Sequence, residues 1–263
     1  FMGAADLHRR ARITGEGTIV AVLDTGTKSN HIDLRDAVVD EACFITPESL
    51  CPSEPHVSED VDGHGTAVAG IIASRGRQSH DGVAPDADVV SVKALEERNN
   101  AVGSALILAM EWVLERGDVD AVTLSLGSGA YRGHCDEASA YTRALAGVVN
   151  RLHDAGTVVV ASSGNDGSST STGAPACVRN AVSVGAIQDY ASGDPKLAQF
   201  TNRNDTLDIL APGVGVVAPS VRGQPQPFSG TSAAAPHISG AMTLLRQAAP
   251  WASAALILDL LKE

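Results

Sequence analysis

Short apolar runs of strand length most constrain how this chain can fold. They lie at 18–23, 89–92, 121–126, 157–161 and 181–187 and contain little polar alternation. Such runs are typical of strands that are buried on both faces of a parallel sheet. Stretches with helical periodicity lie at 66–74, 104–116, 138–153 and 233–248. The alternation predicts an α/β fold with helices on both faces of a central, mostly parallel sheet.

The chain is predicted to form one domain over residues 1–263, because its length suits a large core and no linker or repeat interrupts it. A last helix is expected over 252–262. No apolar run approaches the roughly 20 residues of a membrane span. The start of the chain does not resemble a signal peptide, so we expect any secretory leader to have been removed. The net charge of −12 argues against a nucleic-acid partner, which needs a cationic surface.

The four cysteines have no zinc-ligand spacing and allow three pairings. Cys43 and Cys51 bracket a proline-containing loop that they could close, which leaves Cys135 with Cys177. We expect two disulfides and therefore an oxidising, extracellular compartment. The alternative is that all four are buried free thiols.

Asp24 follows the first apolar run, at the kind of strand end where function gathers in α/β sheets. It could be a turn residue, half of an aspartic protease pair, or an acid that orients a histidine. The chain lacks the second Asp-Thr-Gly or Asp-Ser-Gly that a protease pair needs. The third interpretation requires a suitable histidine and a nucleophile.

His64 is the candidate histidine, because it opens a predicted helix with a glycine on each side. Ser232 is the candidate nucleophile at the start of the helix over 233–248, where its backbone N–H is unpaired and the helix dipole favours negative charge. Pro236 is expected in the first turn, where no donor is lost. Asn165 follows another strand, and its amide could donate to an oxyanion. Taken singly, Ser232 could be a helix cap and Asn165 a turn residue.

These segments together closely resemble the signatures of the subtilase family of serine proteases, in that family's order of Asp, His, Asn and Ser. The resemblance runs from about Gly15 to the C-terminus. It implies a three-layer αβα subtilisin-like fold and an endopeptidase with the triad Asp24, His64 and Ser232. Asn165 and the Ser232 backbone N–H would form the oxyanion hole. No cofactor would be required for this chemistry.

The resemblance also implies where the substrate binds. Asp166, after the oxyanion asparagine, would lie near the S1 pocket and favour a basic P1 residue; the alternative is an exposed turn Asp. An edge strand would pair with the substrate backbone. The edge strand would contain Asn99, Asn100 and Ala101, and the S1 walls would be Ser125, Leu126 and Gly127 facing Ser162, Ser163 and Gly164.

Calcium is a separate expectation. The loop 74–82 lacks the Asn-rich calcium loop of secreted subtilisins, and its two arginines argue against a strong site there. Asp208 matches a family carboxylate that binds calcium with backbone carbonyls, here those of Ala176 and Val178. The alternative is an ordinary Asp at a strand start.

Ala233 follows the nucleophile where the family usually has Met.

The resemblance implies protein or peptide substrates, a propeptide during maturation and a monomer. Two other functions stay open at this point. One is a non-catalytic binding module on the same fold. The other is a processing protease or cyclase that transfers the acyl group to an amine.

Overall fold

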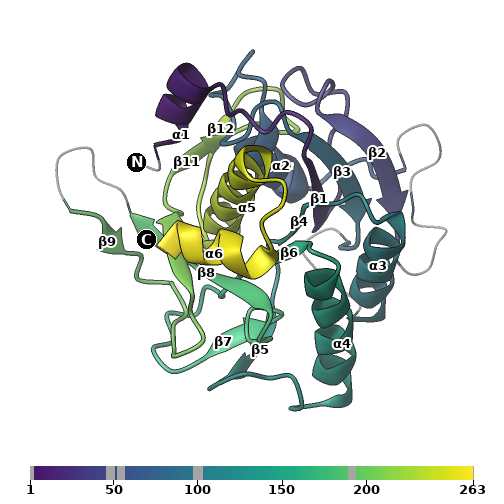
Figure 1. The fold of residues 1–263 in the computed structure, drawn as a ribbon, viewed down its shortest axis with the longest axis vertical. Helices are drawn as coiled ribbons and strands as arrows, with labels where there is room; N and C mark the ends of the chain where they lie inside the picture. The colour runs from purple at the N-terminus through teal and green to yellow at the C-terminus, as the bar shows by residue number, and fades with distance from the viewer. Residues whose placement is uncertain (1–2, 46–50, 52–56, 97–102, 189–193, 263) are drawn as a thin grey trace.

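The computed structural model describes residues 3–45, 51, 57–96, 103–188 and 194–262 (Figure 1). The elements are α1 (Ala4–Asp6), a π-helical turn η1 (Leu7–Ala11), β1 (Ile19–Asp24), β2 (Val38–Cys43), α2 (His64–Ala73), β3 (Asp88–Lys93), α3 (Gly103–Arg116), β4 (Ala121–Leu124), β5 (Ser128–Tyr131), α4 (Ala140–Asp154), β6 (Val158–Ser162), β7 (Thr172–Ala174), β8 (Ala181–Gln188), β9 (Lys196–Leu197), β10 (Ile209–Pro212), β11 (Val216–Ala218), β12 (Gln226–Phe228), α5 (Thr231–Ala248) and α6 (Ala254–Lys262).

An eight-stranded sheet forms the centre of the fold. Its order is β10-β8-β6-β4-β1-β3-β2, with β9 paired to β8. The strands of this order are parallel to their neighbours, and β9 is antiparallel to β8. The predicted α/β class with a mostly parallel sheet is therefore confirmed. The chain adds strands on one side of β1 and then, from β4, on the other. Such a switch point places a crevice at the carboxyl ends of the strands.

Helices cover both faces of this sheet (Figure 1). Successive side chains of a strand point to opposite faces. In β1, Ala21 and Leu23 share a core with α3 and α4, whereas Val20 and Val22 share one with α2. On the α2 side, α5 packs on β6 and β8. Both faces of β1 are buried from solvent, which explains why the sequence of β1 up to Leu23 is continuously apolar and does not alternate with polar residues.

The sequence prediction missed the edge strand β2 and the short strands outside the central runs. Asp40 and Glu41 interrupt the apolar signal of β2, because an edge strand is partly exposed to water. Two small sheets, β5 with β7 and β11 with β12, lie apart from the central one. In Figure 1 the β5–β7 ribbon lies below the central strands.

The two expected disulfides are confirmed. Cys43 is joined to Cys51 and Cys135 to Cys177, with sequence separations of 8 and 42. None of the helices described by the structure is both long and apolar enough to cross a membrane.

Candidate active site

The candidate residues meet where strands of the central sheet end. Asp24 is the last residue of β1, Ser125 follows β4, and Ser162 is the last residue of β6. Two helices start toward the same region, α2 with His64 and α5 with Ser232 in its first turn. The site therefore lies at the switch point of the sheet, between β1 and β4.

The Asp24 carboxylate is fully buried and contacts His64 directly. Its Oδ1 lies 2.7 Å from His64 Nδ1 and accepts a second bond, from the Thr25 N–H, at 2.8 Å. This pairing assigns the proton of the neutral imidazole to Nδ1 and leaves Nε2 as the base. A side chain at position 65 would put its Cβ 2.1 Å from the Gly26 carbonyl oxygen, so glycine beside His64 is what lets α2 approach β1.

The environment of His64 favours its protonated form. Burial lowers its pKa, but attraction to Asp24 and the hydrogen bond between them raise it, and Asp62 and Asp60 raise it further. The net result is a pKa above the usual value for histidine. The Phe228 ring meets the imidazole edge-on, with centroids 5.2 Å apart, and limits the positions that the imidazole can take. His64 is thus prepared to accept and hold a proton.

A second buried carboxylate, Asp60, organises the start of α2. Asp60 is 2% exposed. Its Oδ1 accepts the N–H groups of Asp62 and Gly63 at 3.0 and 2.9 Å, and its Oδ2 accepts the N–H and hydroxyl of Thr66 at 2.9 and 2.6 Å. These bonds fix the turn that presents His64. Sequence reasoning missed Asp60, although an Asp that opens a turn before a helix start was an available signal.

Ser232 forms a reciprocal pair with Ser125. The Ser232 hydroxyl donates to the Ser125 carbonyl at 3.0 Å, and the Ser125 hydroxyl donates to the Ser232 carbonyl at 2.9 Å. The expectation that Pro236 lies in the first turn of its helix is wrong. Because α5 begins at Thr231, Pro236 lies beyond the first turn, and its missing N–H leaves the Ser232 carbonyl without an i+4 donor. The Ser125 hydroxyl supplies that donor.

The Asn165 amide is oriented by the start of α5. Its Oδ1 accepts the Thr231 N–H at 2.8 Å and the Thr231 hydroxyl at 3.0 Å, which turns Nδ2 away from Thr231. A Cβ placed on Gly230 would lie 3.3 Å from Asn165 Nδ2 and 3.6 Å from the Ser232 backbone nitrogen. The Asn165 amide nitrogen and the Ser232 backbone nitrogen therefore lie near the same point at the start of α5. Such a pair can hydrogen-bond a developing oxyanion.

A cavity of about 260 Å³ opens beside Ser232. Most of the expected wall residues line it, whereas Ser163 is fully buried and is not among the lining residues. Asn99, Asn100 and Ala101 lie outside the described residues. The expected lining residues are Ser125, Leu126, Gly127, Ser162, Gly164 and Asp166, and those that sequence reasoning missed are Gly129, Gly173, Asn202 and Thr231.

Asn202 holds Asp166 at the edge of this cavity. The Asn202 amide donates to Asp166 Oδ2 at 3.0 Å, and Asn202 Oδ1 accepts the N–H groups of Asp166 and Ser168, each at 3.0 Å. Asn202 is 2% exposed, whereas Asp166 is exposed. A negative charge is therefore fixed where a bound side chain could reach it. No local pattern in the sequence connects Asn202 to the loop that it supports.

The candidate calcium residues do not line the cavity. Asp208 Oδ1 pairs with Lys262 Nζ at 2.8 Å, and its Oδ2 accepts the Ser183 N–H at 2.9 Å. The Val178 carbonyl accepts a nearby backbone N–H, and Ala176 and Val178 are buried. The described residues contain no cluster of three or more His, Cys, Asp or Glu side chains that could hold a metal ion. Calcium bound by Asp208 with the Ala176 and Val178 carbonyls therefore stays a prediction that these contacts do not support.

Comparison with known proteins agrees with this arrangement. The model of the subtilase family matches residues 15–263. An intracellular serine protease of Paenibacillus polymyxa is 32% identical over 240 residues, which cover 89% of this chain and 68% of the relative. Alkaline elastase YaB of Bacillus sp. strain YaB is 37% identical over 247 residues, or 94% of this chain and 58% of the relative.

Solved structures show the same likeness. The structure of sphericase matches with a TM-score of 0.81 at 26% identity, covering 95% of this chain and 83% of that chain. A cold-adapted subtilisin-like serine proteinase matches with a TM-score of 0.79, also at 26% identity, covering 95% of this chain and 82% of that chain. The fold, the geometry at the strand ends and these likenesses agree: the chain belongs to the subtilase family of peptidases.

Proposed function

We propose that this chain is a serine endopeptidase that uses Asp24, His64 and Ser232 as its catalytic triad and Asn165 in its oxyanion hole. The observation that carries the proposal is the 2.7 Å contact between His64 Nδ1 and the buried Asp24 carboxylate, in the same site as a serine at a helix start. The subtilase membership supports it.

In this mechanism the Ser232 hydroxyl turns from the Ser125 carbonyl toward His64 Nε2 and loses its proton to it as Ser232 attacks the scissile carbonyl. Asp24 stabilises the imidazolium that forms. The oxyanion accepts hydrogen bonds from the Ser232 N–H and the Asn165 amide. Collapse releases the amine, which takes the proton from His64, and leaves an acyl-enzyme. Water, activated by His64, then releases the acid and restores Ser232.

Labelling and mutation test this assignment. A fluorophosphonate probe should label Ser232, and Ser232→Ala should abolish labelling and peptide hydrolysis while the circular dichroism spectrum is unchanged. Undiminished hydrolysis by that variant would refute the assignment. An unlabelled wild-type protein would favour a non-catalytic module. Product masses separate hydrolysis, which adds water, from cyclisation, which does not.

We also propose that Asp166 favours Lys or Arg at P1. The support is its fixed carboxylate at the edge of the cavity. A peptide library that varies P1 should show preference for basic residues in the wild type and its loss in Asp166→Asn. A wild type without that preference would contradict the proposal.

Secretion is a further proposal, supported by the two disulfides, which persist in oxidising compartments. Fractionation of the native cells should find the protein outside the cytosol, and a solely cytosolic protein would contradict it. Protein substrates, a propeptide and a monomeric state are proposed with it from family membership.

A further inference from the structure

One wall of the cavity beside Ser232 is an isolated two-stranded ribbon. Gly129 lies in β5, Gly173 lies in β7, and Gly127 directly precedes β5. The two strands pair with each other and lie outside the eight-stranded sheet. A two-stranded ribbon is at best marginally stable by itself. The position of this wall therefore depends on contacts outside the ribbon.

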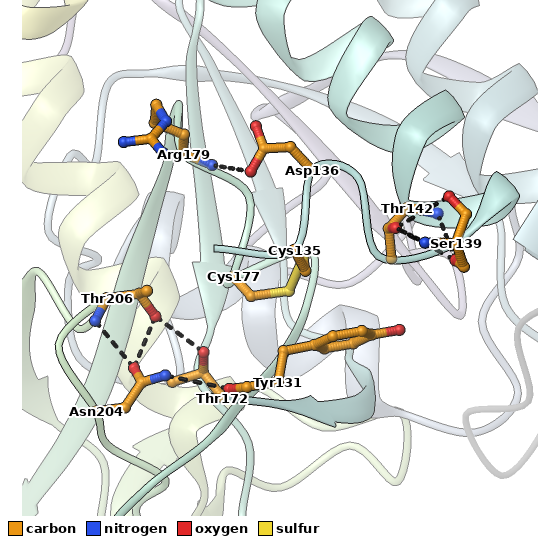
Figure 2. Close-up of a disulfide and its surroundings, with 10 residues drawn as sticks. All are labelled: Tyr131, Cys135, Asp136, Ser139, Thr142, Thr172, Cys177, Arg179, Asn204 and Thr206. Carbon is orange, nitrogen blue, oxygen red and sulfur yellow. Dashed lines mark hydrogen bonds between the residues drawn. A yellow bond between two sulfur atoms is a disulfide. The ribbon is translucent and has the colours of Figure 1, made fainter. Parts of the chain in front are cut away.

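A disulfide joins the two segments that follow the ribbon strands (Figure 2). Cys135 comes shortly after β5, and Cys177 shortly after β7. The Cys135 N–H donates to the Cys177 carbonyl at 3.0 Å, and the Cys177 N–H donates to the Gly173 carbonyl at 3.0 Å. The covalent link is thus one hydrogen bond away from a residue that lines the cavity.

A third segment holds the same ribbon through side chains (Figure 2). The Asn204 amide donates to the Tyr131 carbonyl of β5 at 3.1 Å. Asn204 Oδ1 accepts the N–H and the hydroxyl of Thr206, and the Thr206 hydroxyl lies 3.0 Å from the Thr172 hydroxyl of β7. Both strands of the ribbon are therefore attached to residues 204–206 as well as to each other.

The disulfide itself cannot touch a substrate in the cavity. Cys135 and Cys177 are 1% and 0% exposed and are not among the cavity-lining residues. Any effect on substrate binding must act through the ribbon. The chain also contains a control, because Cys43 and Cys51 form a second disulfide at the end of β2, on the edge of the central sheet, and neither lines the cavity.

We propose that the Cys135–Cys177 disulfide is a positioning element that fixes the shape of the cavity and thereby its selectivity among P1 side chains. The inference rests on the proposed peptidase function. Residues of the ribbon line the cavity together with Ser162 and Gly164, and the disulfide holds the ribbon in place relative to them. Without it, a large P1 side chain is held less well, whereas Ser232, which is anchored by Ser125 and α5, keeps its reactivity.

The test compares two paired variants, Cys135→Ala with Cys177→Ala, and Cys43→Ala with Cys51→Ala. For each we measure kcat and KM on peptides with a large or a small P1 residue, and the rate at which a small fluorophosphonate labels Ser232. The first variant should lower the large-to-small ratio of kcat/KM about tenfold, mainly through KM, which is the size of effect that imperfect pocket fit produces. Its labelling rate should stay within about twofold, and the control variant should keep the wild-type ratio.

An unchanged ratio in the first variant would overturn the inference, and so would an equal fall in both variants, which would indicate general loosening. If the first variant does not fold, Asn204→Ala tests the inference instead. It removes the hydrogen bond to the Tyr131 carbonyl of β5, which attaches the ribbon, while both disulfides remain. That variant should lower the same ratio, and an unchanged ratio would overturn the inference. A wild type that does not label at Ser232 would instead refute the proposed function, so the two failures are distinguishable.

Discussion

Gly230→Ala should remove most of the catalytic activity by obstructing the space between the two proposed oxyanion donors. Gly230 has φ 141° and ψ 169°, a backbone region that is essentially restricted to glycine and costs other residues about 1–3 kcal/mol. The added methyl carbon would lie 3.3 Å from Asn165 Nδ2 and 3.6 Å from the Ser232 nitrogen. An oxyanion must lie about 2.7–3.1 Å from its donors, so the methyl group competes for that space.

We expect kcat to fall about 100- to 1,000-fold, which is the loss known for removing one such donor from a subtilisin. The assay is hydrolysis of a chromogenic peptide, with urea unfolding to measure the stability change. Gly223→Ala is the matched control, because Gly223 has φ 88° and no atom within 4 Å of the added carbon. Gly223→Ala should lower the free energy of unfolding in urea without lowering kcat. A Gly230→Ala enzyme with near-normal kcat, or equal loss in the control, would refute the reasoning.

Three further predictions concern neighbouring residues. Ser125→Ala removes the donor of the Ser232 carbonyl and should cost about 1–3 kcal/mol of unfolding free energy, measured in urea; no measurable change would contradict the role given to that bond. Asp60→Asn removes a negative charge that raises the His64 pKa, so the acid limb of the kcat/KM profile should move to lower pH, because only the neutral imidazole acts as base. An acid limb that stays in place would show that Asp60 does not act on His64 through its charge. The alanine at position 233 should leave the enzyme resistant to peroxide, whereas Ala233→Met should make it sensitive, since a thioether is oxidised to a sulfoxide; equal inactivation of both enzymes would contradict this.

The candidate triad residues could be identified because each lies within a local signal. Asp24 ends an apolar run, His64 opens a helix between glycines, and Ser232 opens another. These residues were expected to lie near one another because the carboxyl ends of parallel strands lie at the same edge of the sheet. The contact between Asp24 and His64 was therefore predictable, whereas the residues that support the triad were not.

Supporting residues depend on contacts between distant parts of the chain. Asn202 holds the loop of Asp166, and Ser125 replaces the donor that Pro236 lacks. The prediction placed Pro236 in the first turn because the exact start of α5 is not encoded locally. The periodicity of the sequence does not indicate these side-chain hydrogen bonds, since a hydrogen bond depends on where two segments lie in space.

The sequence by itself determined the α/β class and the four candidate residues Asp24, His64, Asn165 and Ser232, because burial periodicity and strand-end motifs are local properties. The tertiary structure alone decided which donors face which acceptors. It bonded Asp60 to the first turn of α2, moved Ser163 out of the cavity wall, paired Asp208 with Lys262 and assembled the β5–β7 wall beside the disulfide. The physical reason is that packing brings together groups far apart in the chain, and each buried polar group must then find its partner where packing has placed it.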